Sequence, residues 1–263
     1  MNRVILGILA AALIGVADLG AQNVERRLVT GESLLYTVSF FNLELGEVRL
    51  NVLEKTRNKG ERVLKTEARI TSYPSAPVTV DHHYISYLGD PDHFSRLFQA
   101  WVFKEDHTFQ LTYDFDYSRN RVRVEKGTTD DPGKWADSSG AVSSKMQDGV
   151  SIFYFARMGF GERRTVDVPC FANEAEFITT INYYTNPEPV EIDAIGYPVE
   201  CVKLDGALDF TSVFGLTGEF EGLFTNDEAA IPLVAHLNVW LGVVRLELVE
   251  WERPGWTPPK FDG

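Results

Sequence analysis

Few residues of this chain are placed to do chemistry together. His82 and His83 follow Asp81 and are of the type that binds metal ions, but adjacent side chains on a strand point to opposite faces. Gly149-Val150-Ser151-Ile152-Phe153 begins like the turn that presents a catalytic serine, yet it lacks the second glycine of that motif. The motifs of zinc proteases, phosphate loops and dinucleotide-binding folds are absent. We therefore predict no catalytic residue, no metal site and no cofactor.

Carboxylates are the one group abundant enough to suggest acid–base chemistry. The chain has 38 Asp and Glu residues, and a pair of carboxyl groups is the catalytic apparatus of most glycoside hydrolases. Asp114 and Asp116 share the polar face of one predicted strand, but a solvated pair would occupy the same positions. An enzyme that acts through carboxylates is thus an alternative and not the favoured interpretation.

Cys170 and Cys201 are the two cysteines of the chain. In an exported protein they could form a disulfide, whose closed loop would stabilise the fold by roughly 3.7 kcal/mol. The alternative is two separate buried thiols, a common state of free cysteine. Both alternatives stay open, because the sequence does not show whether the two side chains meet.

The elements that must position these residues are predicted to be strands. Past residue 30, apolar and polar residues alternate with a period of two, the pattern of strands with one buried face. In the clearest case, residues 109–117, Phe109, Leu111, Tyr113, Phe115 and Tyr117 alternate with polar residues. Many strands at short spacing predict an all-β, mainly antiparallel fold with a curved-sheet or barrel-like architecture. Later strands are expected near Thr165–Cys170, Glu176–Tyr184, Tyr197–Leu204, Thr211–Phe220, Ile231–Val239 and Val243–Glu250.

One segment departs from this alternation. Asp148 is placed to cap a short helix over Gly149–Met158 that ends at Gly159. Because the helix is apolar on more than one side, we expect it either to pack inside the curved sheet or to close its mouth. Residues 128–144 are rich in Asp, Gly and Ser and are predicted to form a long loop before it.

The aromatic stripe has two interpretations. It could be the core of a large β protein, or it could line a concave site for an apolar ligand, since such pockets are mostly apolar and aromatic. The candidates for this lining are Trp101, Phe103, Tyr113 and Phe115.

Residues 1–21 have the order of a secretory signal. Arg3 precedes an apolar run from Val4 to Val16, and Leu19-Gly20-Ala21 follows before Gln22. The run is shorter than the about 20 residues of a stable anchor, so we expect no transmembrane anchor after cleavage. Residues 22–253 are expected to form a single β-rich domain, and residues 254–263 a flexible tail. The formal net charge of -13 argues against nucleic acid, whose binders carry basic faces.

Several segments, in their order along the chain, resemble the family catalogued as domain of unknown function 3108. Gly31–Tyr36 with Gly46-Glu47 resembles the opening of that family, and Tyr84–Leu88 with Phe94 a segment that follows. Asp148–Arg157 resembles its central helix, and Asn226-Asp227 with Ile231-Pro232 its end. The resemblance implies an exported, all-β protein of Gram-negative bacteria with no established activity or cofactor. The family pattern has an arginine before its final Ile-Pro, where this chain has Ala230.

Together these observations favour a non-enzymatic periplasmic binding or carrier protein for an apolar or amphipathic ligand such as a lipid. Two alternatives remain. A carboxylate-dependent enzyme acting on envelope glycans or lipids would show two close carboxyl groups with a perturbed pKa. A structural partner of an outer-membrane complex would show a large exposed apolar patch in place of a pocket.

Overall fold

The computed structural model describes residues 27–41, 43–209, 216–239 and 242–262. The predicted signal segment, residues 1–21, lies outside the described residues, as do residues 211–215 of the strand expected over Thr211–Phe220. The described residues form one 15-stranded sheet and one short helix. This confirms the predicted all-β class with a curved antiparallel sheet. In this part of the chain no helix has the length and apolar character needed to cross a membrane.

The sheet consists of two successive meanders. The first contains β1 (Ser33–Phe40), β2 (Leu43–Asn58), β3 (Glu61–Ser72), β4 (Asp81–Gly89), β5 (Ser95–Phe103), β6 (Thr108–Asp116), β7 (Arg121–Thr128) and β8 (Asp131–Ala141). The second contains β9 (Arg164–Ala172), β10 (Ala175–Tyr183), β11 (Glu188–Ile192), β12 (Ile195–Leu208), β13 (Leu216–Thr225), β14 (Pro232–Val239) and β15 (Gly242–Glu252).

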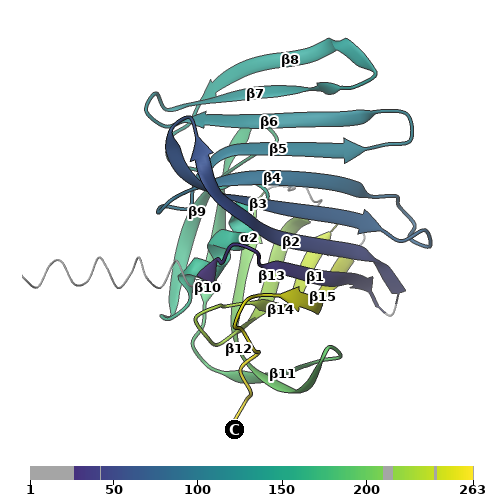
Figure 1. Cartoon of the computed structure of the whole chain (residues 1–263), viewed down its shortest axis with the longest axis vertical. Coiled ribbons are helices and arrows are strands. Elements are labelled where there is room, and N and C mark those ends of the chain that lie inside the picture. Colours follow the sequence, from purple (N-terminus) through teal and green to yellow (C-terminus); the bar gives the residue numbers. More distant parts are fainter. Residues whose placement is uncertain (1–26, 42, 210–215, 240–241, 263) are drawn as a thin grey trace, which may run out of the picture.

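Pairing of the first strand with the last joins the two meanders. The strand order is β8-β7-β6-β5-β4-β3-β2-β1-β15-β14-β13-β12-β10-β9, and β11 pairs with β12. The β1–β15 pairing runs from Ser33 opposite Glu252 to Ser39 opposite Arg245. The sheet curves so strongly that β6 and β9 meet across the interior, where the rings of Tyr113 and Phe171 lie 5.0 Å apart. Figure 1 shows the first meander as a broad curved layer with much of the second behind it.

The helix lies between the two layers. It consists of α2 (Ser151–Ala156) and one 3-10 turn, η1 (Arg157–Gly159). Tyr154 packs in the cluster formed by the first meander, whereas Ile152 and Phe155 pack on the cluster formed by β9, β10, β12 and β13. The prediction of a helix apolar on several sides and enclosed by the sheet is therefore confirmed (Figure 1).

Both predicted ends of this helix have a physical basis in the structure. The Asp148 Oδ1 atom accepts hydrogen bonds from the backbone N–H groups of Val150 and Ser151, each at 2.8 Å. At the other end, a Cβ atom added to Gly159 would lie 1.9 Å from Cζ of Tyr183. Glycine is required there by the close approach of an aromatic ring, and not by a positive φ.

Residues 128–144 do not form the long loop that was predicted. Most of the segment is β8, which pairs with β7 from Arg121 opposite Ala141 to Thr128 opposite Asp131. All side chains from Trp135 to Ala141 are exposed. An edge strand held by one neighbour and facing solvent needs no apolar alternation, so the periodicity that identified the other strands is missing here.

The C-terminal segment, expected to be a flexible tail, is bonded to the domain in this structure. The backbone N–H of Glu200 donates to the carbonyl of Pro259, and that of Phe261 donates to the carbonyl of Pro198, both at 2.9 Å. The Trp256 ring packs edge-on against Trp251 at 5.9 Å. Backbone pairing with β12 and burial of a large aromatic ring hold this segment, and both depend on distant residues.

Candidate binding cavity

A cavity of about 450 Å³ lies between the two layers of the sheet. Its walls come from β1–β3 on one side, from β12–β15 on the other, and from α2 at its inner end. The side chains that line it are mostly apolar, and include Val38, Leu45, Ile70, Phe153, Phe220 and Leu237.

Strand periodicity explains how the sequence builds this lining. Alternate residues of β1, namely Leu34, Tyr36 and Val38, all face the cavity because side chains two apart share a face. Small residues at other lining positions, such as Ala68 and Ala235, leave space that larger side chains would fill. The alternation of apolar and polar side chains that forms a packed core elsewhere in the sheet therefore lines a cavity at this place.

The cavity opens at one end of the strands. Val78, in the connection between β3 and β4, and Glu219, near the start of β13, both line the cavity and are exposed. Leu208, at the end of β12, and Val239, at the end of β14, line it nearby. In an antiparallel sheet the end of one strand lies beside the start of the next. The opening is therefore formed by turns and strand ends on one side of the sheet.

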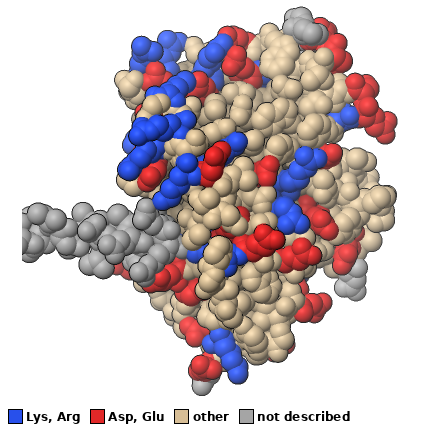
Figure 2. Space-filling view, viewed as in Figure 1, with Lys and Arg blue, Asp and Glu red and all other residues tan. Residues whose placement is uncertain are grey.

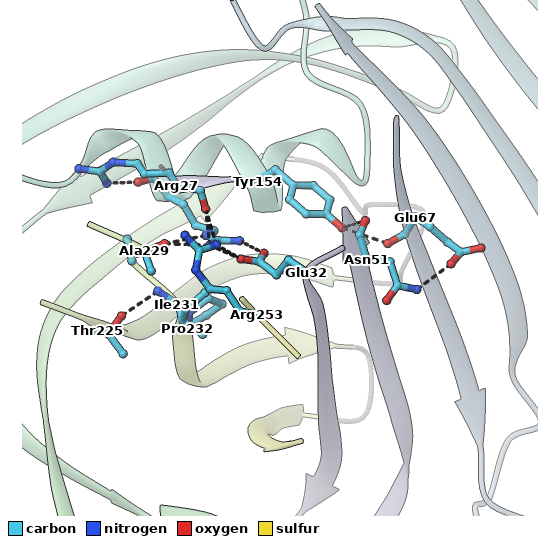
Figure 3. A network of polar contacts seen from close by, with 12 residues as sticks. Arg27, Glu32, Asn51, Glu67, Tyr154, Thr225, Ala229, Ile231, Pro232 and Arg253 are labelled. Carbon is cyan, nitrogen blue, oxygen red and sulfur yellow. Dashed lines mark hydrogen bonds and ion pairs between the residues drawn. The ribbon is translucent and has the colours of Figure 1, made fainter. Parts of the chain in front are cut away.

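A buried charge network closes the inner end (Figure 3). Arg157 Nη1 lies 2.5 Å from Glu32 Oε1, and both side chains are almost completely buried. Arg253 Nη1 contacts the other oxygen of the same carboxylate. Arg157 also donates to the carbonyl oxygens of Ala229 at 2.8 Å and Arg27 at 2.7 Å. Burial acts to lower the pKa of Arg157, but the Glu32 carboxylate outweighs it and the pKa is raised.

This network joins segments that are far apart in the chain. Glu32 precedes β1, Arg157 follows α2, Ala229 lies in the β13–β14 connection, and Arg253 follows β15. Arg157 lines the cavity, but its Nε, Nη1 and Nη2 atoms all donate to protein oxygens. The Arg157 guanidinium therefore stabilises the fold and closes the inner end of the cavity.

Other polar groups in the wall are also bonded to protein. The Tyr154 hydroxyl hydrogen-bonds to the carbonyl oxygens of Asn51 at 2.8 Å and Glu67 at 3.0 Å (Figure 3). The Tyr36 hydroxyl donates to the carbonyl of Pro232 at 3.0 Å. Burial raises the pKa of both phenols. Because these atoms have partners within the wall, the surface they present to the cavity is apolar.

Asp148 is a carboxyl group in this wall. Besides the two backbone N–H groups at the start of α2, its carboxylate accepts a hydrogen bond from the Ser86 hydroxyl. Burial raises the pKa of Asp148, although these hydrogen bonds act to lower it. The donors that hold this carboxylate come from the protein itself, namely Ser86 and the start of α2.

The four aromatic residues proposed as lining do not line the cavity. Tyr113 and Phe115 face inward, but both rings pack edge-on against Phe171, so the interior is filled at that point. Trp101 stacks on His83 at 5.3 Å, and Phe103 lies below the Arg69 guanidinium at 5.4 Å. These last two lie on the opposite face of β5 from buried Phe98 and Ala100. The alternation indicates which residues share a face, but not whether that face meets another layer or a hollow.

The two cysteines are separate buried thiols, the second of the alternatives left open by the sequence. Cys170 lies on β9 and belongs to the cluster with Ile181 and Tyr183, whereas Cys201 lies on β12 in the cluster with Ile231 and Leu248. Burial raises the pKa of each thiol to about 12. Thiols of this kind are poor nucleophiles at neutral pH.

Comparison with known proteins places the chain in a family. Residues 35–249 match the sequence model described as "Protein of unknown function (DUF3108)". The chain belongs to this family. No curated protein matches the sequence significantly. The match extends from β1 to β15, so the walls of the cavity belong to the part of the chain that defines the family.

Solved structures show the fold that this family member shares. A crystal structure of a β-barrel-like protein of domain of unknown function DUF1849 from Brucella abortus superposes with a TM-score of 0.57 at 12% identity, covering 86% of this chain and 98% of that chain. A putative lipoprotein from Parabacteroides distasonis gives a TM-score of 0.34 at 8% identity, covering 86% of this chain and 96% of that chain. The first likeness shows a common fold, and the second is too low to carry an argument.

Two segments by which the sequence resembles the family have structural roles at the closed end of the cavity. Asp148–Arg157 contains the helix cap, α2 and the buried arginine. Asn226-Asp227 lies in the β13–β14 connection, where Asp227 Oδ1 accepts hydrogen bonds from the backbone N–H groups of Ala229 and Ala230. The sequence alone identified these segments but not the ion pair that joins them to Glu32, because no local pattern relates residues so far apart.

Proposed function

We propose that this protein is a non-enzymatic binding or carrier protein of the periplasm that holds an apolar or amphipathic ligand in the cavity between its two layers. The observation that carries the proposal is a cavity of about 450 Å³ with a mostly apolar lining. Ligand sites in proteins range over roughly 300–1,000 Å³ and are predominantly apolar.

The polar groups of the wall support an apolar ligand over a charged one. Arg157, Tyr154 and Tyr36 direct their donors at protein oxygens, so they are not available to a charged ligand. Protein interiors normally contain few voids larger than a water molecule. A hollow of this size between packed layers is thus better explained by an occupant than by a defect of packing.

The location rests on a different part of the chain. The order of charge, apolar run and small residues over positions 1–21 is that of an exported protein. The resemblance to the DUF3108 family points to Gram-negative bacteria, in which the compartment reached by such a signal is the periplasm. The proposed ligand is one that this envelope contains, a lipid or a molecule with an acyl chain.

Ligand content and probe binding test this function. Protein purified from periplasm under native conditions should release an apolar molecule on organic extraction, and the emptied protein should bind N-phenylnaphthylamine with increased fluorescence. Ala235→Phe should weaken probe binding by on the order of tenfold, because the ring would occupy the cavity that Ala235 lines.

Ala136→Phe is the matched control, since Ala136 is an exposed strand residue on β8 away from the cavity. It should leave probe binding unchanged. Recovery of no apolar molecule together with no probe binding by the unmodified protein would disprove the proposal.

The enzymatic alternative receives no comparable support. Glu32, the most buried glutamate of the network, is neutralised by two arginines, and Asp148 is satisfied by Ser86 and the start of α2. Both carboxyl groups are thus engaged by donors of the protein. The partner-of-a-complex alternative calls for a large apolar patch. In the described part of the chain the exposed large apolar side chains number six, and two of them, Trp135 and Ile178, lie on strands away from the cavity opening.

A further inference from the structure

We propose that the open end of the cavity docks on an uncharged lipid surface through an apolar rim formed by Phe41, Leu43, Val78 and Val243. This inference rests on the proposed function, because it supplies the route by which an apolar ligand would enter the cavity. Six large apolar side chains are exposed in the described part of the chain, and four of them form this rim. Their exposed fractions are 87%, 49%, 42% and 53%, respectively.

The four rim residues come from three segments that meet at the opening. Phe41 and Leu43 flank the β1–β2 turn. Val243 lies at the start of β15, on the outer face of the sheet and next to Val244, which lines the cavity. A Cβ atom added to Gly242 would lie 3.1 Å from the Phe40 ring, which places the start of β15 against the end of β1. The backbone N–H of Tyr73 donates to the Leu45 carbonyl at 2.8 Å, which attaches the connection bearing Val78 to the start of β2.

The rim is continuous with the cavity. Val78 belongs to both, and Val38 and Leu45, which line the cavity, lie just behind the β1–β2 turn. An apolar molecule leaving the cavity at this end would therefore pass from one apolar surface to another.

Fold stability does not explain Phe41. Its φ of 52° lies in the left-handed region, which is unfavourable for a bulky residue. With 87% of the residue exposed, its burial contributes little in return, and its ring meets that of the neighbouring Phe40 edge-on. An exposed apolar side chain at an unfavourable φ is expected where that side chain contacts another molecule.

The size of the rim favours a lipid surface over a protein partner. A large aromatic side chain buries about 150–250 Å², so four partly exposed side chains, only one of them aromatic, offer a few hundred Å². Stable protein–protein interfaces bury roughly 1,200–2,000 Å². Insertion of a few apolar tips into the boundary of a lipid layer needs no complementary partner surface.

The charge distribution favours an uncharged surface. Glu44 is exposed beside Leu43, Glu219 is exposed at the opening, and the net charge of the chain is -13. Lys and Arg side chains gather instead at the upper left of Figure 2, toward the β2–β3 turn and the β6–β7 turn, whereas the β1–β2 turn lies on the right in Figure 1. The rim is therefore at the end of the strands that would be repelled by anionic headgroups.

Co-flotation with vesicles tests the proposal. The unmodified mature protein should float with vesicles of phosphatidylcholine, and addition of phosphatidylglycerol should not increase the bound fraction. The double variant Phe41→Asn and Leu43→Thr should reduce the bound fraction by on the order of tenfold, since two of the four apolar contacts become polar. Ile178→Thr, a substitution at an exposed strand residue outside the rim with 44% exposure, should float like the unmodified protein.

Further measurements separate docking from folding and from ligand binding. The thermal midpoint of the double variant should match that of the unmodified protein, and the double variant Val78→Ser and Val243→Thr should show the same loss of flotation if the first one misfolds. Binding of N-phenylnaphthylamine without vesicles should persist in the variant Phe41→Asn and Leu43→Thr, because neither residue lines the cavity. The docking proposal would be overturned if the unmodified protein bound the probe but did not float with vesicles. It would also be overturned if flotation required anionic lipid, or if neither double variant reduced flotation. The proposed function of the cavity would be contradicted only if the unmodified protein failed to bind the probe.

Discussion

Asp148 is a carboxyl group buried in an apolar wall, and its local bonds give it a structural role. One oxygen caps the start of α2 and the other accepts the Ser86 hydroxyl. A carboxylate that accepts several hydrogen bonds can remain charged inside a protein, but here burial has the larger effect and raises the pKa. The same residue therefore positions the helix and makes stability depend on pH.

The pH dependence of stability should change in Asp148→Asn. Because the pKa of the folded state is raised above the usual 3.8, the folded protein holds a proton that the unfolded chain has lost over the interval above 3.8. The contribution of Asp148 to stability is thus present at low pH and declines as the pH rises. Asparagine keeps an oxygen for the N–H groups of Val150 and Ser151 and does not titrate.

Urea unfolding between about pH 4 and pH 7 measures this effect. The free energy of unfolding of the unmodified protein, relative to that of Asp148→Asn, should fall steadily as the pH rises. Two curves that stay parallel across this interval would show that the folded pKa of Asp148 is not raised.

At the scale of elements, α2 depends on its surroundings. A helix of six residues is too short to be stable alone, so packing between the two layers must hold it. The 3-10 turn that follows it meets the second layer at Gly159, where the Tyr183 ring occupies the space of a side chain. That contact sets how near the helix can lie to β10, and hence the position of Ile152 and Phe153 in the cavity wall.

Gly159→Ala should destabilise the fold by about 1–3 kcal/mol, the usual cost of overpacking a core. Urea denaturation measures the change, and Gly196→Ala is the control, because an added Cβ at Gly196 meets nothing within 4 Å. Gly159→Ala should lower the free energy of unfolding less when it is introduced into the variant Tyr183→Leu than when it is introduced into the unmodified protein. Equal costs in both backgrounds would exclude the ring contact as the cause.

At the scale of the whole molecule, the Glu32 network joins the segment before β1, the end of the helix and the segment after β15. Arg157 and Arg253 share one carboxylate, so loss of either cation leaves charge buried without its full set of partners. Removing one partner of a buried ion pair typically costs about 3–5 kcal/mol. The two meanders are hydrogen-bonded to each other through β1 and β15, and the network reinforces this junction.

Arg157→Met should lower the free energy of unfolding by about 3–5 kcal/mol. Arg123→Met is the control and should leave it nearly unchanged, because the pairs of Arg123 with Glu125 and Asp137 are exposed to solvent. In a double-mutant cycle with Glu32→Gln, the second substitution should cost less than it does alone. Additive costs would mean that Glu32 and Arg157 stabilise the fold independently.

Much of the architecture could be predicted from local patterns. Alternation over residues 109–117 predicted β6, and the apolar segment after Asp148 predicted the enclosed helix. β8 was missed because an exposed edge strand carries no alternation. The candidate lining was misplaced at Tyr113, where the pattern is that of an inward face but Phe171 fills the space.

The sequence by itself determined the all-β class, the position of most strands and the enclosed helix, because side-chain periodicity and helix caps are properties of neighbouring residues. The tertiary structure decided which inward face became core and which became cavity, since that depends on how far the two layers stand apart. It also separated Cys170 from Cys201, and it brought Glu32 to Arg253 across 221 positions of the chain. Such contacts follow from the pairing of β1 with β15 and from the curvature of the whole sheet, which no short stretch of sequence contains.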